Sequence, residues 1–315
     1  MSLAGGVIST TTQVWNVLVA SKNGDLAEVK RLVSACPALI YAQYNYTPPI
    51  HLAVREGHFE LVQYLLAHGA HDPDYKTYPF LDNLPTIARD RGFHAIAEAL
   101  DEYAAHPEFH HYKSDNGKIH SHLTPLQQEF EETVDREDLE KTRQMLAAHP
   151  ELAKHDAYFW GEGILTFAAK TCHRKMIELL LSGGASFPSV LKWAQFYYFE
   201  RLDGTAFILE KGMNPNVTSW QHVTILHDMA QKGDVPKAEL LLKHGANIDA
   251  VDEEYRSTPL GLATRWGELE MVEYLLEQGA DPNQAGAAWA APLAWAVKQG
   301  HPEIEETLRR AGAKH

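Results

Sequence analysis

A pattern that recurs about every 33 residues is the strongest constraint on how this chain can fold. Gly233, Gly267 and Gly300 are 34 and 33 residues apart. Gly267 permits a tight turn between two helices, and apolar residues after it, such as Met271 and Leu275, recur at helical spacing. A period of this length predicts a stack of small helical repeats, because one such repeat cannot bury its apolar face alone.

The same short motif opens several of these repeats. It reads TPPIHLA at 47–53, TILH at 224–227 and TPL at 258–260, and each copy leads to a mid-repeat Gly and a closing Gly-Ala. Thr258 is expected to cap a helix whose first turn holds Pro259. These segments resemble the ankyrin signature T-P-L-H-x-A. The resemblance implies an all-α, ankyrin-repeat solenoid of about nine helix-turn-helix repeats.

The resemblance extends over nearly the whole chain, which it divides into nine repeats. The expected repeats are 10–43, 44–77, 78–105, 124–157, 158–187, 188–217, 218–251, 252–285 and 286–315. The repeats at 78–105 and 188–217 lack a clear motif, and the segments 24–39 and 137–152 resemble each other. Because the second of these follows a non-repeat segment, we predict an N-terminal sub-stack at 10–105, an insertion at 106–123 and a C-terminal sub-stack at 124–315.

Composition excludes several classes of function. The formal charge of the 315-residue chain is -14, and no run of Lys or Arg is present. Such a body repels phosphate backbones and anionic lipids, so we expect neither nucleic acid nor membrane as a partner. Cys36 and Cys172 lack C-x-x-C spacing, which argues against a disulfide scaffold. We therefore expect a soluble, cytoplasmic protein.

The resemblance also implies a binding surface, because ankyrin folds present their turns and the ends of their first helices along a concave groove. Large aromatic side chains and Arg at such positions are typical of binding hot spots. Alternatively, individual rings pack against adjacent turns and the carboxylates are solvated. The residues expected to bind the ligand or partner are Tyr44, Asn45, Arg55, Glu56, Tyr75, Tyr78, Phe159, Trp160, Glu162, Trp220, Glu254, Tyr255, Arg265 and Trp266.

The insertion at 106–123 predicts a β-hairpin with an unusual load of histidine. Asn116-Gly117 is a strong two-residue turn signal, and the two-residue period of the flanking strands places His111, His120 and His122 on one face. Three imidazoles on one face can bind zinc or another divalent metal with a water in the fourth position. Alternatively, they are polar hairpin residues that contact neighbouring turns.

Two functions follow. The first is a recognition module that binds a protein or peptide in an aromatic and acidic groove, with no cofactor. The alternative is an enzyme or small-ligand-binding protein whose groove is closed by the His-rich hairpin, with or without the assistance of a divalent metal such as zinc. No phosphate-binding loop, G-x-S-x-G elbow or H-E-x-x-H motif is present in the sequence.

Overall fold

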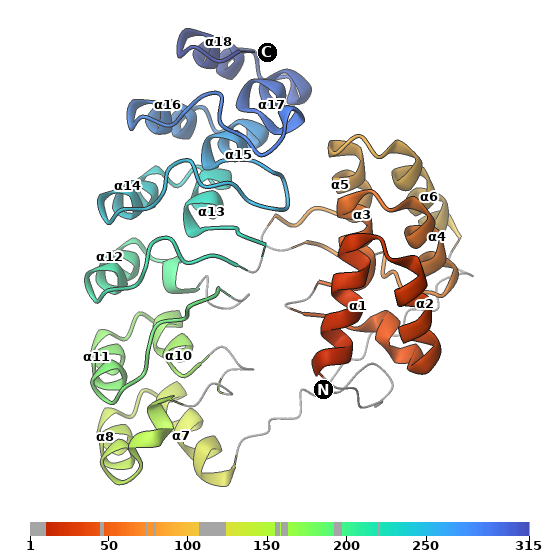
Figure 1. Cartoon of the computed structure of the whole chain (residues 1–315). Coiled ribbons are helices and arrows are strands. Elements are labelled where there is room, and N and C mark those ends of the chain that lie inside the picture. Colours follow the sequence, from red (N-terminus) through yellow and green to blue (C-terminus); the bar gives the residue numbers. More distant parts are fainter. Residues whose placement is uncertain are drawn as a thin grey trace. The chain divides into compact units, whose positions relative to one another are not determined.

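The computed structural model describes residues 11–44, 47–73, 75–77, 80–106, 124–154, 158, 163–191, 197–219 and 221–314. In these ranges the chain is helical, and its only extended pairings are three isolated β-bridges. The chain forms two compact units, Met1–Lys118 and Ile119–His315. Each unit is built by the stacking of antiparallel helix pairs (Figure 1).

The N-terminal unit contains three helix pairs. Its elements are α1 (Thr11–Asn23), α2 (Leu26–Ala35), the 3-10 helix η2 (Pro37–Tyr41), α3 (Pro49–Glu56), α4 (Phe59–Ala67), α5 (Leu84–Asp90) and α6 (His94–Ala105). The first helices α1, α3 and α5 pack side by side in chain order, and α4 packs on α6 (Figure 1). The result is two helical layers with the apolar side chains between them.

The C-terminal unit continues the same arrangement over more repeats. Its elements are α7 (Pro125–Asp135), α8 (Leu139–Ala148), η4 (Pro150–Lys154), α10 (Leu165–Lys170), α11 (Arg174–Ser182), α12 (Leu202–Glu210), α13 (Ile225–Gln231), α14 (Val235–Lys243), α15 (Pro259–Trp266), α16 (Leu269–Glu277), η6 (Ala288–Ala290), α17 (Pro292–Gln299) and α18 (Pro302–Arg310). The first helices α13, α15 and α17 pack in one layer, and α12, α14, α16 and α18 pack in the other (Figure 1).

Local sequence explains where the helices begin and turn. Thr258 caps α15, because its side-chain oxygen accepts a hydrogen bond from the Gly261 N–H at 3.2 Å, and Pro259 occupies the first turn. Gly267 ends α15 with φ +81, in the left-handed region. A Cβ at this position would also lie within 2.9 Å of the His301 ring of the next repeat. The cap and the turn predicted from the sequence are thereby confirmed.

The buried apolar residues recur with the same period as the sequence motif. Leucines at one position of the first helices and at one position of the second helices are buried in three successive repeats. They are Leu226, Leu260 and Leu293 in the first helices, and Leu241, Leu275 and Leu308 in the second helices, none more than 2% exposed. The helices that carry these leucines pack against the corresponding helices of the neighbouring repeats, which is why the stack depends on its period.

Eight of the nine expected repeats are present as helix pairs in the described ranges. In the repeat at 188–217 the described α-helix is α12, and residues 192–196 lie outside the described part. The β-hairpin predicted at 106–123 falls on residues 107–123, which are not described either, so the structure gives it no support. Within the described ranges, every helix is too short or too polar to cross a lipid bilayer.

Candidate recognition site

Aromatic and cationic side chains converge where the last two repeats meet. Tyr255 precedes α15, Arg265 and Trp266 end that helix, and Trp295 lies in α17 of the next repeat. The Arg265 guanidinium carbon lies 4.0 Å from the centre of the Trp266 ring, 4.3 Å from that of Tyr255 and 5.3 Å from that of Trp295. At these distances each ring attracts the guanidinium through a cation–π interaction.

The rings also contact one another edge to face, the arrangement that aromatic pairs favour. The centre of the Tyr255 ring lies 5.8 Å from that of Trp266 and 6.1 Å from that of Trp295. Trp289 extends the group, with its ring 5.8 Å from Trp295. The Lys298 ammonium lies 5.2 Å from the centre of the Trp295 ring. We call Tyr255, Arg265, Trp266, Trp289, Trp295 and Lys298 the Arg265 cluster.

The buried carboxylate of Asp252 stabilises the turn at 252–257, which precedes α15 and contains Tyr255. Asp252, only 1% exposed, accepts hydrogen bonds from the backbone N–H groups of Tyr255 at 2.6 Å and Ser257 at 3.0 Å. The Ser257 hydroxyl in turn accepts a hydrogen bond at 2.8 Å from the indole N–H of Trp295. The turn of one repeat and the first helix of the next are therefore joined, which fixes the rings before any partner arrives.

Burial separates the members of the cluster into a support and an accessible face. Tyr255 and Trp295 are fully buried, as is the neighbouring Glu254, and Arg265 is 9% exposed. Trp266 and Trp289 are partly exposed, and Lys298 is exposed. Tyr255 therefore fits the alternative in which a ring packs against the adjacent repeat, since Trp295 of that repeat contacts it.

Other predicted residues lie in the N-terminal unit and form smaller groups. The Tyr44 ring meets Trp15 edge to face, 5.7 Å between centres. The Tyr75 hydroxyl lies 2.8 Å from His51 Nδ1. Arg55 is fully buried and pairs with Glu56, Nε to Oε1, at 2.9 Å. Thus four predicted residues, Tyr44, Arg55, Glu56 and Tyr75, are placed within the N-terminal unit.

Several predicted residues cannot be placed. Asn45, Tyr78, Phe159, Trp160, Glu162 and Trp220 lie outside the described residues, as do the proposed metal ligands His111, His120 and His122. Among the residues that are described, no group of three or more His, Cys, Asp or Glu side chains is arranged to hold a metal ion. The metal site therefore stays a prediction.

Two buried titratable residues, His227 and Asp228, have structural roles. His227 is fully buried; its Nδ1 accepts from the Thr224 N–H at 3.1 Å, which leaves Nε2 to donate to the Ser257 carbonyl at 3.2 Å. Burial lowers the pKa of His227 to about 4. Burial raises the pKa of the neighbouring Asp228, although its partner Lys232 acts in the opposite direction. The hydrogen bond to Ser257 thus joins His227 to the turn of the next repeat.

Trp289, Trp295 and Lys298 were missed by sequence reasoning. The last repeat opens with Ala291-Pro292-Leu293, in which Ala replaces the Thr of the motif. The Pro-Leu pair was a usable signal, since it aligns Trp295 with Leu262 of the preceding repeat and Lys298 with Arg265. That alignment places Lys298 at the end of a first helix, where the other candidate residues had been sought.

Comparison with known proteins identifies the repeats. A family model described as ankyrin repeats, in three copies, matches residues 194–286, and a single ankyrin-repeat model matches 45–78. A stretch of 122 residues, 38% of the chain, is 33% identical to an Arf-GAP with coiled-coil, ANK repeat and PH domain-containing protein 2 from Oryctolagus cuniculus. A stretch of 94 residues, 30% of the chain, is 34% identical to the palmitoyltransferase ZDHHC17 of Danio rerio.

These relatives are much larger proteins, and the chain spans only 15% of the length of each. Among solved structures, an ankyrin repeat domain from Acinetobacter baumannii AYE aligns with 59% of this chain and 98% of its own, at 24% identity and a TM-score of 0.49. The fold assignment rests on the helix pairs and on the two repeat matches.

Proposed function

Because the chain is an ankyrin-repeat protein, we propose that it works as a recognition module that binds a protein or peptide partner. Ankyrin repeats generally mediate protein–protein interactions. In this chain we place the docking face at the Arg265 cluster, where Trp266, Trp289 and Lys298 are accessible and the other members support them. Trp and Arg are the side chains that most often dominate the binding energy of interfaces.

The arrangement of Arg265 is the observation that carries this proposal. Its guanidinium is held against three rings and is nearly buried, so the rings have little freedom left to lose when a partner binds. A face ordered in advance binds more tightly, because ordering flexible side chains on association costs about 0.5–1.5 kcal/mol each.

The charges favour a particular kind of partner. Glu254 is fully buried, whereas Lys298 is exposed at the edge of the cluster. Among the members of the Arg265 cluster, the exposed charge is therefore the positive charge of Lys298. We therefore propose a partner segment that presents an apolar or aromatic side chain to Trp266 and Trp289 and a carboxylate to Lys298.

Substitution of the accessible tryptophans tests this function. Peptides are selected from a displayed random library on the full chain, and their dissociation constants are measured by fluorescence anisotropy. Trp266→Ala or Trp289→Ala is expected to weaken binding about 30-fold, which corresponds to about 2 kcal/mol for the loss of one aromatic anchor. Circular dichroism verifies that each variant keeps its helical content.

Trp15→Ala is the matched control, since Trp15 is an exposed tryptophan, 49% accessible, in α1 of the N-terminal unit. Its loss is expected to leave the dissociation constant within twofold of the wild-type value. Selected peptides that bind folded Trp266→Ala and Trp289→Ala as tightly as the wild type would show that the partner docks elsewhere.

A further inference from the structure

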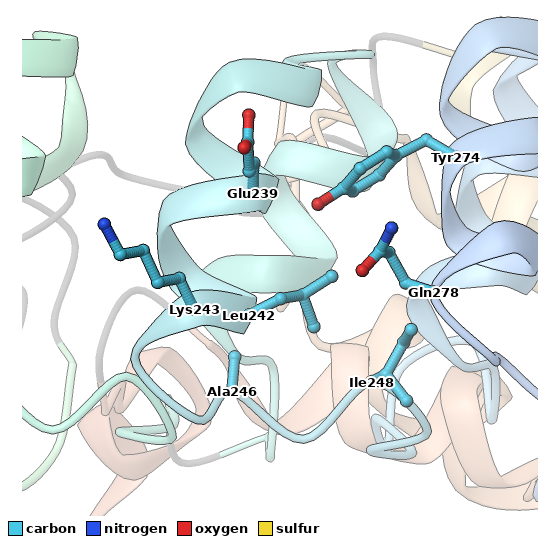
Figure 2. Close-up of a pocket in the computed structure, with 7 residues that line it drawn as sticks. All are labelled: Glu239, Leu242, Lys243, Ala246, Ile248, Tyr274 and Gln278. Atoms are coloured by element: carbon cyan, nitrogen blue, oxygen red, sulfur yellow. The ribbon is translucent and has the colours of Figure 1, made fainter.

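A hollow between α14 and α16 differs chemically from its counterpart in the N-terminal unit. Its volume is about 470 Å³, within the range of small-ligand pockets. It is lined by Glu239, Leu242, Lys243, Ala246, Ile248, Tyr274 and Gln278 (Figure 2). These residues lie on the second helices of their repeats and on the segment that follows α14, so none of them belongs to the Arg265 cluster.

The repeat register identifies the counterpart. Glu239 follows the turn residue Gly233 by six positions, as Lys30 follows Gly24. Tyr274 follows the turn residue Gly267 by seven positions, as Tyr64 follows Gly57, and the position of Gln278 corresponds to that of His68. All four turn glycines have positive φ, so the positions are structurally as well as numerically equivalent.

In the N-terminal unit, the chain's own side chains surround the tyrosine. The Lys30 ammonium lies 5.4 Å from the centre of the Tyr64 ring, within cation–π range. The His68 ring packs on Tyr64 with 4.2 Å between centres, and its Nδ1 donates to the Tyr64 carbonyl at 2.7 Å. The face of this tyrosine is therefore occupied by a cation from the preceding repeat.

In the C-terminal unit, the cation is replaced by an anion. Glu239 occupies the position equivalent to that of Lys30, and its side chain is exposed. The Tyr274 hydroxyl and the Gln278 amide point into the hollow, above Leu242 and Ile248, and Lys243 extends away from them (Figure 2). Both residues line the same hollow. Burial, and secondarily the charge of Glu239, raise the pKa of Tyr274.

We propose that this hollow binds the side chain of a lysine from a partner protein, with its ammonium beside Tyr274 and Glu239. Its aliphatic part would cover Leu242 and Ile248, as long cationic side chains commonly do on apolar surface. The Gln278 amide oxygen adds a hydrogen-bond acceptor for the ammonium. The formal charge of -14 attracts a basic partner to the chain as a whole.

Nuclear magnetic resonance titration of the full chain tests the proposal with two probes of nearly equal shape. Nα-acetyl-lysine-N-methylamide should shift the signals of Leu242, Tyr274 and Gln278 in a saturable manner. The neutral norleucine analogue should bind at least fivefold more weakly, because it lacks the ammonium. Equal affinity for the two probes would overturn the proposal.

Substitutions at Glu239 provide a second test of the proposal. Glu239→Gln should weaken the lysine probe at least fivefold, and Glu239→Lys should abolish binding, because it restores the cation that Lys30 supplies in the N-terminal unit. Glu277→Gln, on the exposed side of α16, is the matched control and should bind like the wild type. Wild-type affinity in both Glu239 variants would also overturn the proposal. Trp266→Ala should not affect this titration, so the result is independent of the function proposed above.

Discussion

At the scale of single residues, Arg265 packs against three aromatic rings. A guanidinium over an aromatic ring contributes about 0.5–1 kcal/mol at the surface and about 2 kcal/mol when desolvated. Arg265 contacts three such rings and is 9% exposed, so its interactions lie toward the upper end of that range. Lysine cannot replace it equally, since only the planar guanidinium stacks on a ring.

His227 predicts how stability depends on pH. Its pKa of about 4 in the folded chain lies below the ordinary value of 6.5. Below pH 6.5, His227 is protonated in the unfolded chain but stays neutral in the folded chain. The free energy of unfolding therefore decreases as the pH falls from 6.5 toward 4. Between pH 7.5 and pH 5 this loss amounts to about 2 kcal/mol. Urea unfolding of wild type and His227→Gln at both pH values measures it.

The comparison uses the difference between the two proteins, because they share all their other titratable groups. His227→Gln keeps a donor and an acceptor, and its free energy of unfolding should fall by about 2 kcal/mol less than that of the wild type over the same pH interval. Parallel pH dependence in the two proteins would contradict the assigned burial of a neutral imidazole.

The residue scale also shows what sequence could and could not reveal about the site. Arg265 and Trp266 were predicted because they align with the motif at the end of a first helix. The sequence left open whether Tyr255 packs or faces solvent, because its burial depends on Trp295, which belongs to the next repeat. The link between them, from the Trp295 indole to Ser257, joins residues 38 positions apart, and single-sequence patterns carry no such information.

At the scale of elements, the mid-repeat turn decides how each helix pair closes. Most repeats place Gly at this turn, but Glu137 and Cys172 occupy it in the first two pairs of the C-terminal unit, with φ +60 and +54. A side chain in the left-handed region costs about 1–2 kcal/mol relative to glycine. These two turns were recognisable in sequence only by position, because neither carries the expected glycine.

Glu137→Gly is therefore expected to stabilise the protein. Relief of the left-handed strain should raise the free energy of unfolding by about 1 kcal/mol, measured by urea unfolding followed by circular dichroism. Arg136→Gly is the matched control: Arg136 has φ -78, so glycine relieves nothing there and should lower stability. A Glu137→Gly variant no more stable than wild type would contradict the account of this turn.

The helix pairs were the most predictable elements, since their bounds follow from caps, turn glycines and the apolar period. Pro259 and Gly267 delimit α15 as expected, and even the weak motif at 84–88 opens α5. The repeat at 188–217 lacks a clear motif, so no local signal in the sequence predicts where a first helix would begin. Its second helix, α12, still follows from its place before the next repeat.

At the scale of the whole molecule, each compact unit carries its own core and its own surface chemistry. The C-terminal unit holds both the Arg265 cluster on its first-helix side and the hollow between α14 and α16. We expect a repeat stack of this kind to bind a partner with little rearrangement of its backbone. Partner binding should therefore slow hydrogen exchange at the contact site and leave it unchanged elsewhere.

Hydrogen–deuterium exchange of the full chain, with and without a selected peptide, tests the docking face most directly. If the partner binds the Arg265 cluster, exchange should slow at 253–258, 264–267 and 286–298 and stay unchanged over α1 to α6. Unchanged exchange in those three segments, together with slowing in any other part of the chain, would contradict it.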